Sequence, residues 1–103
     1  MRVFCPLGLL ASLLVGCTGA EGSADVLRLG YFANVTHAPA IIGVDRGFFE
    51  DALGPDVKLE LVTFSSGPEA VEALFSGSVD ATFVGPNPAI SGYQKSEGDA
   101  LRV

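Results

Sequence analysis

The polar residues best suited to chemistry fall in three short loops, each between a predicted strand and a predicted helix. These loops are residues 33–37, 65–67 and 85–87, and they contain no Lys, Arg, Asp, Glu or Cys. Their hydroxyl, amide and imidazole groups donate and accept hydrogen bonds. A loop that begins a helix also presents free backbone N–H groups and the positive end of the helix dipole. Together the loops predict a site for an oxyanion or another acceptor-rich ligand.

The same loops lack the residue sets that catalysis requires. Ser65 and Ser66 could act as nucleophiles only beside a general base, and the single histidine, His37, has no cysteine or second histidine as a partner. A hydrogen-bonding role at a loop or helix end fits His37 better than metal ligation or general-base chemistry. The loops also offer no paired carboxylates and no metal cluster. We therefore predict binding without turnover, with no metal and no cofactor.

Composition excludes several classes of protein. The chain has 103 residues, a formal net charge of −6 and 49% hydrophobic residues, which allow at most one ordinary domain. An acidic chain without a Lys/Arg cluster lacks the basic surface that nucleic-acid phosphates require. Its two cysteines are too few for a disulfide scaffold or a zinc finger.

Residues 1–16 are typical of a secretory signal peptide. Residues 3–15 carry no charge and follow one cation, Arg2, but a membrane-spanning helix needs about 20 apolar residues. The run Leu14-Val15-Gly16-Cys17 has the form of a bacterial lipobox, which predicts cleavage before Cys17 and lipidation of that residue. Residues 17–24 would then be a flexible tether to the outer face of the cell membrane. The alternatives are a plain signal peptide with an incidental cysteine and a buried apolar helix.

Strand-like and helix-like segments alternate from residue 25 onward. Residues 26–32, 57–64 and 80–84 favour strands, and a fourth strand is predicted from residue 100 to 103. Their spacing leaves room for crossover helices, as in parallel β-α-β units. Charged residues on one face make 57–64 a predicted edge strand, whereas 81–84 has no polar face and is predicted to be central. The fold class is therefore α/β, an open parallel sheet flanked by helices, with ligands expected beyond the carboxyl ends of the strands.

Capping residues mark the predicted helix ends. The run Ser66-Gly67-Pro68-Glu69 combines an N-cap serine with a capping-box glutamate, and Gly77 suits the left-handed residue that ends a helix. Asn87 before a proline is predicted to cap the next helix, and Thr36 to cap a first helix that ends at Gly47. Capping alone would explain Ser66 and Asn87 without any ligand.

Three consecutive segments resemble a known family. Residues 29–32, 36–40 and 45–49, in this order, are similar to the opening of solute-binding proteins of ABC importers for nitrate, aliphatic sulfonates and taurine. Residues 65–70 and 85–89 resemble the segments that follow. The resemblance covers essentially all of the chain from residue 26, and the lipobox agrees with the anchoring usual in this family.

This resemblance implies a type II periplasmic-binding-protein fold, in which two lobes close on a small-molecule ligand about a hinge. Residues 25–103 would be an incomplete first lobe, and the chain an N-terminal fragment of an extracytoplasmic, lipid-anchored importer component. Its partners would be permease and ATPase subunits. Because one lobe contacts one side of a ligand, we expect weak or absent capture by this chain alone. The implied pocket residues are Asn34, Thr36, His37, Ser65, Ser66, Gly67, Pro86 and Asn87.

Two other functions stay open on the sequence. An enzyme on the same fold is one, because pyrimidine-precursor synthases and some dehydratases resemble these proteins; predicted secretion and the single histidine argue against it. A ligand-sensing lipoprotein that delivers nothing is the other, and neighbouring genes for a permease and an ATPase would distinguish it. Since the loops carry no Lys or Arg, a neutral aromatic ligand also fits.

Overall fold

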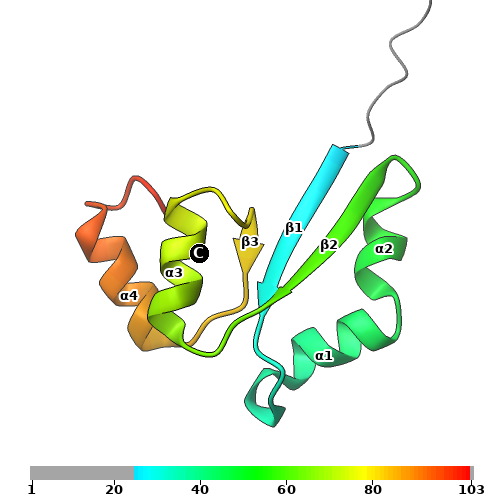
Figure 1. The fold of residues 1–103 in the computed structure, drawn as a ribbon, viewed down its shortest axis with the longest axis horizontal. Coiled ribbons are helices and arrows are strands. Elements are labelled where there is room, and N and C mark those ends of the chain that lie inside the picture. Colours follow the sequence, from blue (N-terminus) through cyan, green and yellow to red (C-terminus); the bar gives the residue numbers. More distant parts are fainter. Residues whose placement is uncertain (1–24, 103) are drawn as a thin grey trace, which may run out of the picture.

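The computed structural model describes residues 25–102, which fold into short strands and helices in alternation (Figure 1). The predicted signal peptide and tether lie outside the described residues. The elements are β1 (Asp25–Tyr31), the 3₁₀ helix η1 (Val35–His37), α1 (Ala38–Asp45), α2 (Phe48–Leu53), β2 (Val57–Thr63), α3 (Gly67–Phe75), β3 (Ala81–Thr82) and α4 (Pro86–Lys95).

The strands form one parallel sheet in the order β2-β1-β3, which confirms the predicted α/β class and the edge position of β2. The pairing of β1 with β2 runs from Asp25 opposite Val57 to Tyr31 opposite Thr63. Figure 1 shows α1 and α2 on one side of the sheet and α3 and α4 on the other. This arrangement is consistent with part of one lobe of a periplasmic-binding-protein fold.

The prediction that residues 80–84 form a central strand is wrong. The strand β3 comprises Ala81 and Thr82, and it lies at an edge, with β1 central. The segment lacks a polar face because helices flank it on both sides. The Phe83 ring lies 6.0 Å from the Phe49 ring of α2, while Thr82 borders a cavity with Val71 of α3.

The fourth predicted strand is also absent from the described part of the chain. Residues 100–102 form neither a strand nor a helix, and Val103 lies outside the described residues. Leu101 is nevertheless buried, because it packs against α4: a Cβ added to Gly92 would lie 2.9 Å from Leu101 Cδ1. Burial against a helix therefore explains the apolar pattern that suggested strand pairing.

The helix α3 begins and ends as its sequence predicts. Ser66 is the N-cap, and its Oγ accepts a hydrogen bond from Glu69 N at 3.4 Å. Gly77 has a φ of 72°, and the N–H groups of Gly77 and Ser78 donate to the carbonyls of Leu74 and Ala73. These two bonds form a Schellman motif, which fixes the end of the helix before β3.

The caps predicted for the other two helices are wrong. Thr36 lies within η1, whose N-cap is Asn34, and α1 starts after His37 with no side-chain cap. The helix α4 starts at Pro86, so Asn87 is already in its first turn and Gly85 is the N-cap. In both places the chain turns into a helix earlier than the polar residue suggests. The predicted end at Gly47 is confirmed by its φ of 68°.

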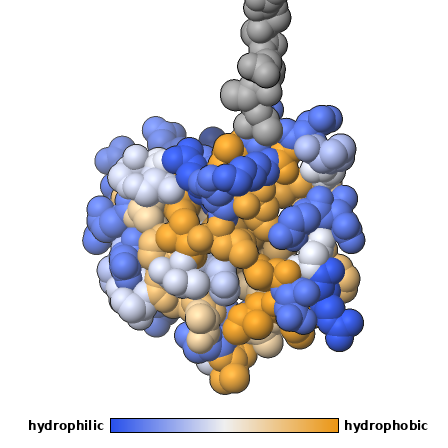
Figure 2. Space-filling model, turned by 45° about the vertical axis from the view of Figure 1, so that its right-hand side comes forward, coloured by the Kyte–Doolittle hydropathy of each residue, from blue (hydrophilic) through white to orange (hydrophobic). Residues whose placement is uncertain are grey.

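The buried core is small and lies on both faces of β1. Figure 2 shows that apolar surface stays exposed between polar patches on one face of the molecule. Within residues 25–102 no helix has both the length and the apolar character needed to cross a membrane. The buried apolar residues are Leu29, Phe32, Ala40, Ala70, Val71, Val79 and Leu101.

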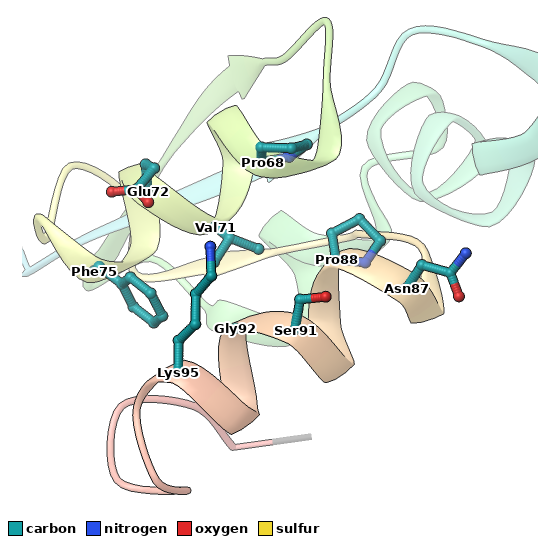
Figure 3. A pocket seen from close by; sticks show the side chains of 9 residues that line it. All are labelled: Pro68, Val71, Glu72, Phe75, Asn87, Pro88, Ser91, Gly92 and Lys95. Atoms are coloured by element: carbon teal, nitrogen blue, oxygen red, sulfur yellow. The ribbon is translucent and has the colours of Figure 1, made fainter.

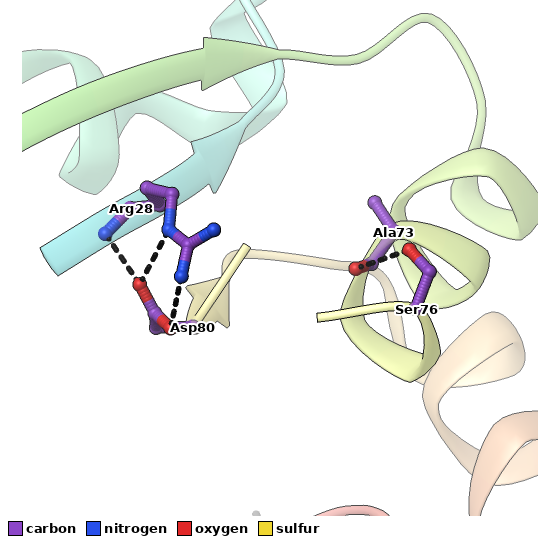
Figure 4. A network of polar contacts seen from close by, with 4 residues as sticks. All are labelled: Arg28, Ala73, Ser76 and Asp80. Atoms are coloured by element: carbon purple, nitrogen blue, oxygen red, sulfur yellow. Dashed lines mark hydrogen bonds and ion pairs between the residues drawn. The ribbon is translucent and has the colours of Figure 1, made fainter. Parts of the chain in front are cut away.

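One ion pair fastens β3 to β1 at the end of the sheet opposite the three loops. Asp80 Oδ2 accepts hydrogen bonds from Arg28 N at 2.8 Å and Arg28 Nε at 3.2 Å (Figure 4). Asp80 N also donates to Arg28 O at 2.9 Å. The backbone N–H of Arg28, and to a lesser degree its guanidinium, lower the pKa of the Asp80 carboxyl. The carboxylate thus reinforces the backbone hydrogen bond that joins the start of β3 to β1.

We expect Asp80→Asn to destabilise the fold at neutral pH and to flatten its acid dependence. Because the folded-state pKa of Asp80 is lowered, its stabilisation is present above the unfolded-state pKa and is lost as the pH falls through the folded value. Urea unfolding from pH 7 to pH 3 measures both effects. Glu60→Gln is the matched control, since Glu60 pairs with Lys58 on the exposed surface. Equal acid dependence in Asp80→Asn and the unsubstituted chain would contradict this prediction.

Candidate ligand-binding cleft

The three loops leave the same edge of the sheet because all three strands are parallel. Two backbone hydrogen bonds hold the loop starts against β1: Phe64 N donates to Tyr31 O at 3.0 Å, and Phe83 N donates to Gly30 O at 2.9 Å. The carboxyl ends of the strands therefore carry all the connections predicted to bind ligand. This is the edge at which open α/β sheets bind ligands.

A cleft of about 390 Å³ opens at this edge between η1 and the connection from β3 to α4. Three of the predicted site residues, Thr36, His37 and Pro86, border it together. Gly85, from the predicted loop 85–87, also borders it, and three further lining residues were not predicted from the sequence: Pro39, Phe83 and Val84. Phe83 and Val84 were assigned to a strand, and the early end of β3 leaves them free to form one wall.

The His37 side chain is held against the core. Its ring lies 4.6 Å from the Phe32 ring at an interplanar angle of 33°, and Phe32 is buried. The backbone N–H of His37 donates to Asn34 O at 3.0 Å. Within residues 25–102 neither imidazole nitrogen has a hydrogen-bond partner, so both are available to a ligand.

Asn34 shapes the cleft without bordering it. Its Oδ1 accepts hydrogen bonds from Thr36 N at 3.1 Å and from the Thr36 hydroxyl. The proton of that hydroxyl is engaged by Asn34, so Thr36 presents its lone pairs to the cleft unless a ligand turns it. Asn34 is therefore a positioning residue for η1, while Thr36 and His37 face the space that a ligand would occupy.

Ser65 and Ser66 are engaged at the start of α3. Glu69 Oε2 accepts hydrogen bonds from Ser65 N at 3.0 Å and from Ser65 Oγ at 2.9 Å. These bonds, first of all the one from the Ser65 backbone N–H, lower the pKa of Glu69. Neither serine borders the cleft. The structure thus gives this loop a capping role, which was the simpler of its two interpretations.

Prolines limit the donors that the helix starts can offer. Pro39, Pro68, Pro86 and Pro88 occupy the first turns of α1, α3 and α4, and proline has no N–H. At the start of α4 this leaves one backbone N–H, that of Asn87, before Ala89 N donates to Gly85 O. The helix starts therefore offer fewer free backbone N–H groups to a ligand than the sequence predicts.

Asn87 faces a different cavity. It borders a space of about 330 Å³ between α3 and α4, together with Val71, Phe75, Ser91 and Lys95 (Figure 3). Gly67 does not border the cleft either. It packs against α4, since a Cβ added to Gly67 would come within 2.2 Å of Pro88 Cγ. Among residues 25–102 no group of three or more His, Cys, Asp or Glu side chains could hold a metal ion.

The fold is of the α/β class whose ligands bind beyond the carboxyl ends of parallel strands. The model of the NMT1-like family matches residues 20–103, so the chain belongs to this family. A protein of Bacillus subtilis (strain 168), named as an aliphatic sulfonates-binding protein, is 36% identical over 86 residues, which cover 78% of this chain and 25% of that protein. This chain therefore spans about a quarter of the length of that relative. No solved structure matches the chain.

Proposed function

We propose that this chain forms part of the solute-binding component of an ABC importer, and that its ligand is a small anion of the aliphatic sulfonate, nitrate or taurine class. The cleft bordered by Thr36, His37 and Pro86 carries the proposal, because it has the size of a small-molecule site and lies where the fold class binds ligands. The name of the Bacillus subtilis relative supports the sulfonate class.

The proposed role is binding without turnover. The residues that line the cleft supply an imidazole, a hydroxyl and backbone groups, and among the described residues no carboxylate or lysine borders it. The Thr36 hydroxyl donates to Asn34 and not to His37, so among the described residues no hydrogen-bonded pair of nucleophile and base lies there. An enzyme on the same fold is the second candidate, but no observation in the described part of the chain favours it.

Capture would require more of the protein than these residues. The cleft contacts a ligand from one side, and the matching relative is about four times as long as the matched region. We propose that a second lobe closes on the ligand by hinge motion and that the closed form delivers it to permease and ATPase subunits. Without the second lobe, residues 25–102 would bind the ligand only weakly.

The location proposed for the protein follows from its first residues. Residues 1–16 would direct export, Cys17 would be lipidated, and residues 17–24 would tether the sheet to the outer surface of a bacterial cell membrane. Such placement suits an importer component, because the ligand must be collected outside the membrane that the permease crosses.

Thermal unfolding in the presence of ethanesulfonate tests the binding proposal. We expect a saturable rise in melting temperature with a half-maximum in the millimolar range; a ligand at ten times its Kd adds about 1.4 kcal/mol. Thr36→Val should weaken the effect, because an anion that turns the Thr36 hydroxyl away from Asn34 gains its proton as a hydrogen-bond donor, and valine has none. Ser91→Ala, in the cavity between α3 and α4, should leave it unchanged.

The comparison solution is sodium chloride at equal ionic strength. If chloride stabilised the chain as much as ethanesulfonate, or if Ser91→Ala removed the effect and Thr36→Val did not, the cleft would not be the binding site. If the rise in melting temperature saturated at micromolar ethanesulfonate, the affinity would be too high for a cleft that contacts one side of the ligand, and that expectation would be contradicted.

A further inference from the structure

In the part of the chain that the structure describes, one side chain that borders the cleft can carry a positive charge. Among its described lining residues His37 is ionisable, and the others are Thr36, Pro39, Phe83, Val84, Gly85 and Pro86. Histidine is the side chain whose charge ordinarily changes between pH 5 and pH 8. The charge of the cleft therefore depends on a single proton.

The His37 ring is positioned to use that proton on a ligand. It stacks on Phe32 at 4.6 Å, and Phe32 in turn lies 6.5 Å from Phe64. This stacking limits the movement of the imidazole without engaging its nitrogens. In residues 25–102 neither nitrogen donates to or accepts from another group, so protonation gives the cleft two N–H donors and one positive charge.

Within residues 25–102, the elements around His37 supply no counter-charge to the cleft. The first turns of η1, α1 and α4 carry no acidic residue, and residues 83–86 carry no charge. The last residue of β1 is Tyr31, and the charges of α1, Asp45 and Arg46, lie at its far end. Glu69, in the first turn of α3, is held by two hydrogen bonds from Ser65 and does not border the cleft.

We infer that anion binding in this cleft is coupled to protonation of His37, an inference that rests on the proposed function. Where the free histidine is neutral, one proton is taken up from solvent for each anion bound, and the imidazolium becomes the counter-charge of the ligand. Since the anion stabilises the protonated ring, affinity must rise as the pH falls. The cleft would then select permanently anionic ligands over neutral ones of similar size.

Ethanesulfonate titrations between pH 5.5 and pH 8 test this coupling, because the probe stays ionised throughout. We expect Kd to be about tenfold weaker at pH 8, which corresponds to about 1.4 kcal/mol. In His37→Asn, which keeps an amide donor but does not titrate here, Kd should be nearly independent of pH. In Glu69→Gln the pH dependence should persist, since Glu69 is tied to Ser65 and not to the cleft.

The unsubstituted chain supplies a second measurement that needs no variant. His37 is the single histidine, so its imidazole C–H resonances are unambiguous in a proton NMR titration. Saturating ethanesulfonate should move their midpoint to higher pH.

The coupling would be overturned if the NMR midpoint did not move or if Kd were the same at every pH. It would also be overturned if the pH dependence of Kd survived in His37→Asn or vanished in Glu69→Gln. Each of these results would leave the binding proposal intact. Absence of saturable binding at every pH would overturn the proposed function and the coupling together.

Discussion

Gly67→Ala should destabilise the chain by about 1–3 kcal/mol, the usual effect of forcing an extra carbon into a packed contact. The added Cβ would lie 2.2 Å from Pro88 Cγ and 2.9 Å from Pro88 Cβ. A proline ring cannot turn aside, so the start of α3 would have to move away from α4. Equilibrium unfolding in urea measures the loss.

The double variant Gly67→Ala/Pro88→Ala separates this clash from other effects. Removing the ring should restore most of the lost stability, giving a coupling free energy of about 0.5–3 kcal/mol. Gly85→Ala is the matched control: its φ is −68°, and its added Cβ would meet its nearest neighbour at 3.9 Å. Because alanine restricts the unfolded chain but caps a helix less well than glycine, Gly85→Ala should change stability by at most about 0.5 kcal/mol. Equal losses in Gly67→Ala and Gly85→Ala would show that Gly67 does not set the approach of the two helices.

Cys17→Ser should abolish lipid labelling altogether. If residues 14–17 are a lipobox, the thiol of Cys17 is the acceptor of the first lipid, and serine cannot replace it. Metabolic labelling of bacterial cells with palmitate should mark the unsubstituted chain and leave Cys17→Ser unmarked. The variant should also leave the membrane fraction, because stable anchoring depends on the acyl chains.

Cys5→Ser is the control for labelling, because Cys5 lies in the segment that cleavage would discard. It should be labelled like the unsubstituted chain. Equal labelling of Cys17→Ser and the unsubstituted chain would exclude lipidation at Cys17 and leave a plain signal peptide as the better interpretation.

The sequence predicts local structure most reliably at positions where a residue type has one physical role. Ser66 at the start of α3 and Gly77 at its end were both correct, because a hydroxyl before a helix and a residue with positive φ after it have few alternatives. The alternation of strands and helices likewise specified a parallel α/β sheet, and the polar face of residues 57–63 placed β2 at its edge.

The errors arise where several contexts produce the same pattern. Apolar residues around position 82 suggested a central strand, but α2 and α3 flank them instead of neighbouring strands. Leu101 suggested a strand and is buried by α4. Asn87 looked like a cap, yet α4 starts at Pro86, since proline fits the first helical position and the extended Gly85 precedes it.

Topology predicts where the loops meet, because parallel strands bring all three to one edge of the sheet. Of the pocket residues that the family resemblance implied, Thr36, His37 and Pro86 border the cleft at this edge, and their role in binding stays a prediction. No rule of composition could show that Glu69 would engage Ser65, or that Asn87 would border the cavity between α3 and α4. Those outcomes depend on how the start of α3 packs against α4.

Amide NMR during an ethanesulfonate titration tests the central claim most directly, because it reports where the ligand binds. We expect saturable shifts concentrated at residues 36–37 and 83–85, with a Kd on the order of 1 mM, or about −4.1 kcal/mol. Shifts concentrated instead along residues 87–95 and 68–75 would place the ligand between α3 and α4. That result, or the absence of any saturable shift, would contradict a ligand-binding role for the cleft.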